Sequence, residues 1–263
     1  MLVSMPHIGT VIPPALQSSF VPRALAVEDT DWHLAQLYDF LPALGISVLQ
    51  PQYSRYVIDL NRPPDDAAMY PGASNTELCP TRFFNGDALY KAGQEPLPQE
   101  VQRRRSAYWQ PYHDALAAEL QRLKALHGFA LLWDAHSIRS YIPWLFEGKL
   151  PDLNIGTASG LSASPAISSA ASNAIAGQTQ TQTPTQMQGF SNVVNGRFKG
   201  GYITRHYGQP AQHVHAVQLE KCQCLYMMET PPYAYNQARA AQLQPTLKRM
   251  VQASLQAAQD LYA

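Results

Sequence analysis

The sequence predicts an α/β fold in which a mixed, mostly parallel sheet carries helices on both faces. Short runs of strand length alternate along the chain with longer segments of helical periodicity, and this alternation is typical of a mainly parallel sheet. The chain has 263 residues, of which 46% are hydrophobic, so it can bury a large core as one domain over residues 1–263. In such folds, ligands bind beyond the carboxyl ends of the strands.

Six segments are expected to form strands. Short runs rich in apolar residues between turn residues are typical of buried strands, and alternating apolar and polar residues indicate half-buried ones. In chain order the expected strands span residues 2–5, 46–50, 54–62, 129–133, 153–157 and 214–219. The segment 129–133 is the clearest, because Gly128 ends the preceding helix and the polar residues Asp134, His136 and Arg139 follow it.

Four segments have the periodicity of helices. They span residues 34–41, 98–127, 165–176 and 235–261. Thr30 or Asp31 can cap the first helix, Pro111 is expected to kink or divide the second, and Ser164 can cap the third. The basic residues 103–105 are expected on the solvent-exposed side of the second helix.

Three further segments are expected to lie outside regular structure. Residues 65–92 are rich in proline, glycine and asparagine, which favours a long ordered loop that walls an active site. Residues 177–188 repeat threonine and glutamine, so we expect a low-complexity surface loop without a chemical role. Residues 190–208 contain several glycines, which either bring the backbone close to a ligand or belong to a hairpin with exposed charges.

Composition argues against several classes of function. Nineteen basic and nineteen acidic residues cancel, so no overall field favours nucleic acid or an anionic membrane as a partner. No apolar run approaches the roughly 20 residues of a membrane span, and the first residues lack a secretory signal, so a cytoplasmic protein is expected. The three cysteines match no zinc ribbon or redox pair. The sequence also lacks a serine-hydrolase elbow and the glycine motifs of nucleotide-binding proteins.

Polar side chains lie at the end of, or just after, four of the predicted strands. They are His7, the pair Asn61 and Arg62, the pair Asp134 and His136, and Glu220. One parallel or mixed sheet can bring these groups to a single edge. Two imidazoles and a carboxylate are the ligand set of a catalytic zinc site, arginine binds a carboxylate through two bonds, and glutamate is a suitable general base. The sequence therefore indicates a metal-dependent hydrolase that acts on a small molecule.

Several long motifs also carry a resemblance to a known family. They are residues 6–10, 29–32, 55–66, 136–139, 195–208 and 218–220. In this order they resemble the bacterial N-formylglutamate amidohydrolases over nearly the whole chain. The resemblance implies hydrolysis of N-formyl-L-glutamate to formate and L-glutamate in histidine degradation. It also implies a three-layer fold of the zinc-exopeptidase (phosphorylase/hydrolase-like) type, related to carboxypeptidases and aspartoacylase-like deacylases.

The wider group implies roles for individual residues. His7 and His136 match its histidine ligands, Asn61 and Arg62 match its Asn-Arg pair, and Glu220 matches its catalytic glutamate. The group takes a further ligand from a glutamate three residues after the first histidine, but this chain has Thr10 there. A carboxylate must come from elsewhere, and we expect Asp31, with Asp29 as the second choice.

The resulting hypothesis is a Zn²⁺ site, or a site for another divalent metal, formed by His7, Asp31 and His136. Glu220 is expected to act as the general base and acid. We expect Arg62 to bind one carboxylate of the substrate and Arg139 or Arg205 the other. The lesser candidates for substrate binding are Arg55, Asn61 and His206.

Two alternatives stay open. The same chemistry could act on another N-acyl amino acid, because the sequence does not show that the pocket admits only a formyl group. A carboxylate-binding protein without catalysis is the second, because the usual glutamate ligand is absent at Thr10.

Overall fold

A six-stranded mixed sheet forms the centre of the protein in the computed structural model, which describes residues 1–69, 75–176 and 189–263. The strands are β1 (Leu2–Ser4), β2 (Ser47–Leu49), β3 (Ala130–Ile138), β4 (Leu153–Gly156), β5 (Asn192–Val194) and β6 (Val214–Cys222), in the order β2-β1-β3-β6-β4-β5. The first four in this order are parallel, β4 runs antiparallel to β6, and β5 is parallel to β4. The prediction of a mixed, mostly parallel sheet is confirmed.

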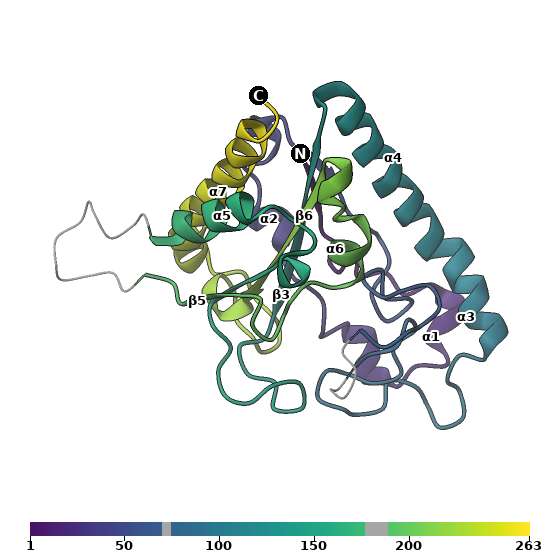
Figure 1. Ribbon diagram of the computed structural model, residues 1–263. Coiled ribbons are helices and arrows are strands. Elements are labelled where there is room, and N and C mark those ends of the chain that lie inside the picture. Colours follow the sequence, from purple (N-terminus) through teal and green to yellow (C-terminus); the bar gives the residue numbers. More distant parts are fainter. Residues whose placement is uncertain (70–74, 177–188) are drawn as a thin grey trace.

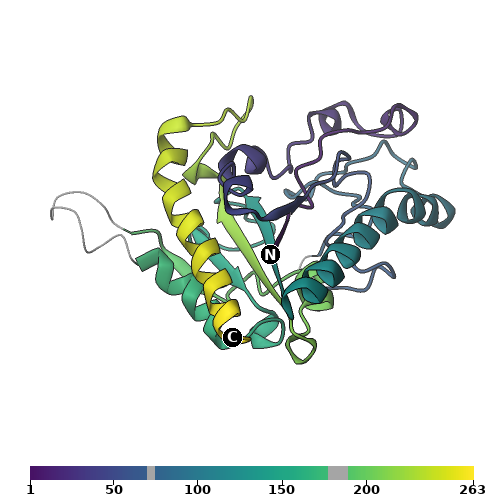
Figure 2. The same ribbon diagram turned by 90° about the horizontal axis from the view of Figure 1, so that it is seen from above.

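Helices cover both faces of this sheet (Figures 1 and 2). One face packs against α2 (Leu34–Leu37), α5 (Pro165–Ala176) and α7 (Gln237–Asp260), and the other against α3 (Pro98–Arg104), α4 (Gln110–His127) and α6 (Tyr202–Tyr207). A short helix, α1 (Pro14–Gln17), lies in the first long connection. Side chains alternate along β3, so that Trp133 and Leu132 enter the two separate cores. The expected three-layer arrangement is therefore present.

The long helix predicted over residues 98–127 is interrupted where proline was expected to disturb it. A π-helical turn, η3 (Arg105–Trp109), separates α3 from α4 just before Pro111, as expected for a residue that lacks the N–H and crowds the preceding turn.

The basic residues 103–105 are not wholly exposed, in contrast to the prediction. Arg104 is only 2% exposed, and its guanidinium donates to Glu100, Tyr90 and the carbonyl of Val57.

The predicted strand at 54–62 is wrong. This segment forms two consecutive turns, in which the amides of Val57 and Arg62 donate to the carbonyls of Ser54 and Asp59. Side chains reinforce both turns, because Ser54 Oγ accepts from the Tyr56 amide and Asp59 Oδ1 accepts from the Asn61 amide. Such local side-chain bonds compete with a sheet ladder, and they place Asp59 and Asn61 beside the site described below.

The predicted cap at Thr30 or Asp31 is also wrong. His33 has a left-handed backbone with φ of 59°, so the helical turn begins only at Leu34 and ends at Leu37. Thr30 Oγ1 donates to the carbonyl of Val27 instead.

Other segments agree with the sequence more closely. Residues 75–92 contain only isolated bridges and no helix or strand, as expected for part of the long loop 65–92. The segment 190–208 contains β5 and α6, and α6 was not predicted. The low-complexity segment 177–188 lies outside the described residues. No helix in the described part of the chain is long and apolar enough to cross a membrane.

Candidate metal centre and active site

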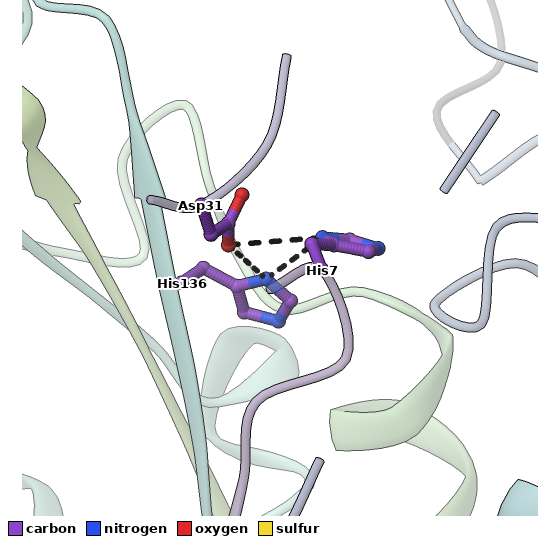
Figure 3. A group of neighbouring side chains, drawn as sticks. All are labelled: His7, Asp31 and His136. Carbon is purple, nitrogen blue, oxygen red and sulfur yellow. Dashed lines mark hydrogen bonds and ion pairs between the residues drawn. The ribbon is translucent and has the colours of Figure 1, made fainter. Parts of the chain in front are cut away.

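Three side chains from different elements point toward one another at one end of the sheet (Figure 3). His7 lies in the turn after β1, Asp31 in the loop before α2, and His136 on β3. The Asp31 amide donates to the carbonyl of His7 at 3.0 Å, and Asp31 Oδ2 accepts from the amide of Ser137, also at 3.0 Å. These bonds bring the loop to the sheet edge. All three side chains are buried.

The three donor atoms have the spacing of metal ligands. His7 Nδ1 lies 3.2 Å from His136 Nδ1, and Asp31 Oδ2 lies 3.4 Å from His136 Nδ1 and 3.8 Å from His7 Nδ1. Bonds of about 2.0–2.1 Å in a tetrahedron around Zn²⁺ place neighbouring donors roughly 3.3 Å apart. This cluster, the one such group among the described residues, therefore fits a divalent cation.

Two more carboxylates lie behind the imidazoles. His7 Nε2 is 2.7 Å from Asp59 Oδ1, and His136 Nε2 is 3.0 Å from Asp134 Oδ2. A carboxylate on the far nitrogen favours the tautomer whose other nitrogen can bind a metal, and it raises the basicity of that nitrogen. Arg55 donates to the second oxygen of Asp59 at 2.7 Å. The arrangement holds both rings with Nδ1 toward the centre.

The charges of the cluster favour a cation at its centre. Burial alone would lower the pKa of His136, but the carboxylates of Asp134 and Asp31 outweigh burial and raise this pKa to about 10. Burial would likewise raise the pKa of Asp31, yet His136 and His7 hold it below its ordinary value. Burial lowers the pKa of His7, which favours the neutral form of this imidazole. The carboxylates around His136 at the same time stabilise a positive charge next to His7.

Glu220 is positioned next to this cluster by sheet register. It lies on β6 directly opposite His136 on β3, so both side chains project from the same face of the sheet. Burial raises the pKa of Glu220 to about 8, and its Oε1 has no hydrogen-bond partner among the described residues. A buried carboxylate with a raised pKa and an unpaired oxygen can accept and return a proton near neutral pH.

The structure brings most of the predicted site residues to one cavity. The candidates that line it are His7, Asp31, Arg55, Asn61, Arg62, His136 and Glu220. Asn61 Nδ2 lies 3.1 Å from His136 Nε2, while Asn61 Oδ1 accepts from the amide of Ile203. Arg62 donates to the carbonyl of Thr76 at 2.9 Å and to its hydroxyl at 2.7 Å. The cavity thus joins the three-donor cluster to cationic and amide groups.

Four other candidates do not line this cavity. Arg139 donates to Asp29 at 3.0 Å and lines a separate hollow. Asp29 is buried and accepts from the Tyr56 hydroxyl and the Phe84 amide, so the structure places Asp31 rather than Asp29 beside the imidazoles. On α6, Arg205 donates from Nε to the carbonyl of Gly200 at 2.8 Å, and His206 lines another groove.

Sequence reasoning missed three residues of the site as candidates. Asp59 supports His7, while Gln218 and Arg197 line the cavity. Gln218 lies two residues before Glu220, a spacing that puts both side chains on one face of a strand. That spacing could have identified Gln218. Asp59 could have been found as the acid two residues before Asn61, but only once a turn replaced the predicted strand.

Comparison with known proteins identifies the family of the chain. Residues 1–227 match the sequence model of the N-formylglutamate amidohydrolases. The chain belongs to the N-formylglutamate amidohydrolase family. It is 48% identical over 263 residues to the N-formylglutamate deformylase of Pseudomonas aeruginosa, covering 100% of this chain and 95% of the relative. It is 49% identical over 255 residues to the enzyme of the same name from Pseudomonas putida, covering 97% of this chain and 92% of that relative.

Solved structures show the same fold. The N-formylglutamate amidohydrolase of Ralstonia eutropha JMP134 superposes with a TM-score of 0.79 at 22% identity, over 96% of this chain and 92% of the other. A gene product of Agrobacterium tumefaciens superposes with a TM-score of 0.65 at 16% identity, over 96% and 89%. At these identities the likeness supports the fold of the amidohydrolase family and no more.

Proposed function

We propose that this protein hydrolyses N-formyl-L-glutamate to formate and L-glutamate at a divalent metal site. The observation that carries the proposal is the three-donor cluster beside the buried Glu220, whose Oε1 has no hydrogen-bond partner among the described residues, in one cavity of a chain 48% identical to a deformylase. Zn²⁺ is the ion we expect, because two imidazoles and one carboxylate are a common catalytic zinc set. The resemblance further suggests a cytoplasmic enzyme of histidine degradation.

His7, Asp31 and His136 would hold the metal. When bound, such an ion polarises a carbonyl oxygen and lowers the pKa of water to about 7. Glu220 then removes a proton from the attacking water and delivers it to the amine nitrogen as the C–N bond breaks. Its raised pKa suits both roles, since the carboxylate must hold the proton between the two steps. Asn61 and Arg62 are expected to orient the substrate.

The direct test measures formate release from N-formyl-L-glutamate together with the metal content of the purified protein. We expect turnover with about one bound metal per chain, and loss of turnover on chelation that added Zn²⁺ restores. Parallel assays with N-acetyl-L-glutamate and N-formyl-L-aspartate define the acyl and side-chain preference. Faster turnover of either analogue would reject N-formyl-L-glutamate as the substrate, and ligand binding without metal or turnover would indicate a binding protein.

Asp59 to asparagine is expected to weaken metal binding about 10- to 100-fold, the usual effect of losing a carboxylate behind a histidine ligand. The change keeps the size of the side chain but removes the charge that supports His7. Metal affinity is measured by competition with a chromogenic chelator. Asp114→Asn on the exposed side of α4 is the matched control. Equal affinities in the two variants would show that Asp59 does not support the ligand.

Arg62 to lysine is expected to lower kcat/KM for N-formyl-L-glutamate about 10- to 100-fold, because an ammonium cannot reproduce a planar fork that binds a carboxylate. The Arg62 guanidinium is already oriented by three bonds, to Thr76 and to the carbonyl of Asn61. Steady-state kinetics measure the effect, and Arg122→Lys on the surface of α4 serves as the control. An unchanged kcat/KM would remove Arg62 from the substrate site.

A further inference from the structure

One arginine at the cavity was not among the candidates from the sequence. Arg197 lies between β5 and α6, and it lines the same cavity as Glu220 and Arg62. Its Nε donates to the carbonyl of Leu145 at 3.2 Å, and its guanidinium carbon lies 5.4 Å from the centre of the Phe198 ring. Leu145 and Phe198 also line the cavity. A carbonyl from a separate segment and the ring of the next residue therefore hold this guanidinium at the cavity wall.

The proposed substrate carries two carboxylates, and a carboxylate that leaves water for a protein cavity needs a cationic partner. Among the described residues, the arginines that line the cavity are Arg55, Arg62 and Arg197. Arg55 is buried behind the metal cluster, where it bonds Asp59 at 2.7 Å and lies 3.8 Å from Asp31. Arg55 thus serves the carboxylates of the cluster. Arg62 and Arg197 instead donate from Nε to neutral carbonyls, those of Thr76 and Leu145, and we consider these two for the substrate.

The chemistry of the substrate distinguishes these two arginines. The α-carboxylate stands on the carbon bonded to the formamide nitrogen, so it must bind close to the reacting C–N bond. Arg62 directly follows Asn61, whose side-chain Nδ2 lies 3.1 Å from Nε2 of His136. The γ-carboxylate lies beyond two methylene groups, and these need an apolar wall. Leu145 and Phe198 provide such a wall, and Arg197 is fixed beside them.

We propose that Arg197 binds the γ-carboxylate of the substrate and determines the preference for a glutamate over a glutamine side chain. This inference rests on the proposed function, since it assigns one part of the same cavity. It replaces the expectation from the sequence that Arg139 or Arg205 binds the second carboxylate, because neither lines the cavity.

The test compares N-formyl-L-glutamate with N-formyl-L-glutamine, whose neutral side-chain amide has nearly the same size. We expect Arg197→Met to lower kcat/KM for N-formyl-L-glutamate about 10- to 100-fold, the usual range for a hydrogen bond to a charged group. For N-formyl-L-glutamine we expect a change of less than about 3-fold, because this substrate lacks the charge that Arg197 binds. The ratio of the two values is measured within each protein, so partial loss of folded enzyme cancels.

Two comparison variants sharpen the result. Arg62→Met should lower kcat/KM for both substrates alike, because both carry the α-carboxylate. Arg139→Met should leave the glutamate-to-glutamine ratio at its wild-type value. The inference is overturned if Arg197→Met leaves the ratio of kcat/KM for the two substrates at its wild-type value. It is also overturned if Arg139→Met removes the preference for the glutamate substrate instead. Failure of the proposed function is a separate result, seen as no formate release by the wild-type protein.

Discussion

Glu220 to glutamine is expected to lower kcat for N-formyl-L-glutamate about 10²- to 10⁴-fold, the usual contribution of a positioned general base, while the metal content stays unchanged. The glutamine keeps the shape of the side chain but cannot take a proton from water. Because Glu220 is not one of the three clustered donors, its loss should separate turnover from metal binding. Single-turnover formate release and metal analysis of the same preparation measure the two effects.

The pH profile gives a second, independent readout for Glu220. A general base must be ionised, so activity should rise with pH through the pKa of this carboxylate. Burial raises that pKa to about 8, and a carboxylate close to a bound cation ionises at lower pH. We therefore expect an acidic limb with an apparent pKa below about 8 in the wild type. The residual activity of Glu220→Gln should lack this limb.

Glu229→Gln is the matched control for this variant. Glu229 also carries a partly buried carboxylate near the end of β6, but it accepts from the amides of Ser140 and Cys224 and does not line the cavity. Its replacement should change kcat by less than about 3-fold, because it touches neither substrate nor reacting atoms. If Glu220→Gln kept wild-type turnover, or lost its metal together with its activity, Glu220 would not be the general base.

The sheet edge could be predicted because it depends on local patterns. Apolar runs located β1 and β3, alternating apolar and polar residues located β6, and neighbouring parallel strands have their carboxyl ends at a common edge. His7, His136 and Glu220 were expected there for this reason, and the structure brings them to one cavity. The predicted strands at 129–133 and 214–219 were too short. His136 and Glu220 lie inside β3 and β6, and each strand continues for two residues beyond them.

The surroundings of the edge could not be predicted, because they depend on pairs far apart in the chain. Arg139 follows a central strand and was expected to bind a substrate carboxylate, but it donates to Asp29, 110 positions earlier, and lines a separate hollow. Arg197 reaches the cavity through a contact with Leu145, from a segment whose sequence allowed either a ligand wall or an exposed hairpin. No periodicity in either segment encodes these contacts. Asp59 was missed because alternating apolar and polar residues predicted a strand over residues 54–62. The segment forms turns instead, and one of them is stabilised by the bond from the Asn61 amide to Asp59.

The second large effect is expected for Asp31 to alanine, which should lose bound metal and with it nearly all turnover. Asp31 Oδ2 lies 3.4 Å from His136 Nδ1 and 3.8 Å from His7 Nδ1, so it is the single carboxylate of the three-donor cluster. Its removal leaves two neutral donors. We expect metal affinity to fall by more than about 100-fold, beyond the range for groups that only support a ligand. Metal analysis after gel filtration and formate release measure the effect.

Asp29→Asn separates the loss of a ligand from the loss of a buried carboxylate. Asp29 lies two residues earlier and is also buried, but its oxygens accept from Tyr56, the Phe84 amide and Arg139. This variant can lose stability and should still bind about one metal per folded chain, because the donor cluster is intact. If instead Asp29→Asn lost the metal and Asp31→Ala kept it, the ligand assignment would be reversed. If both variants kept the metal, the cation would bind elsewhere, since two neutral imidazoles alone do not replace the negative charge that Asp31 supplies.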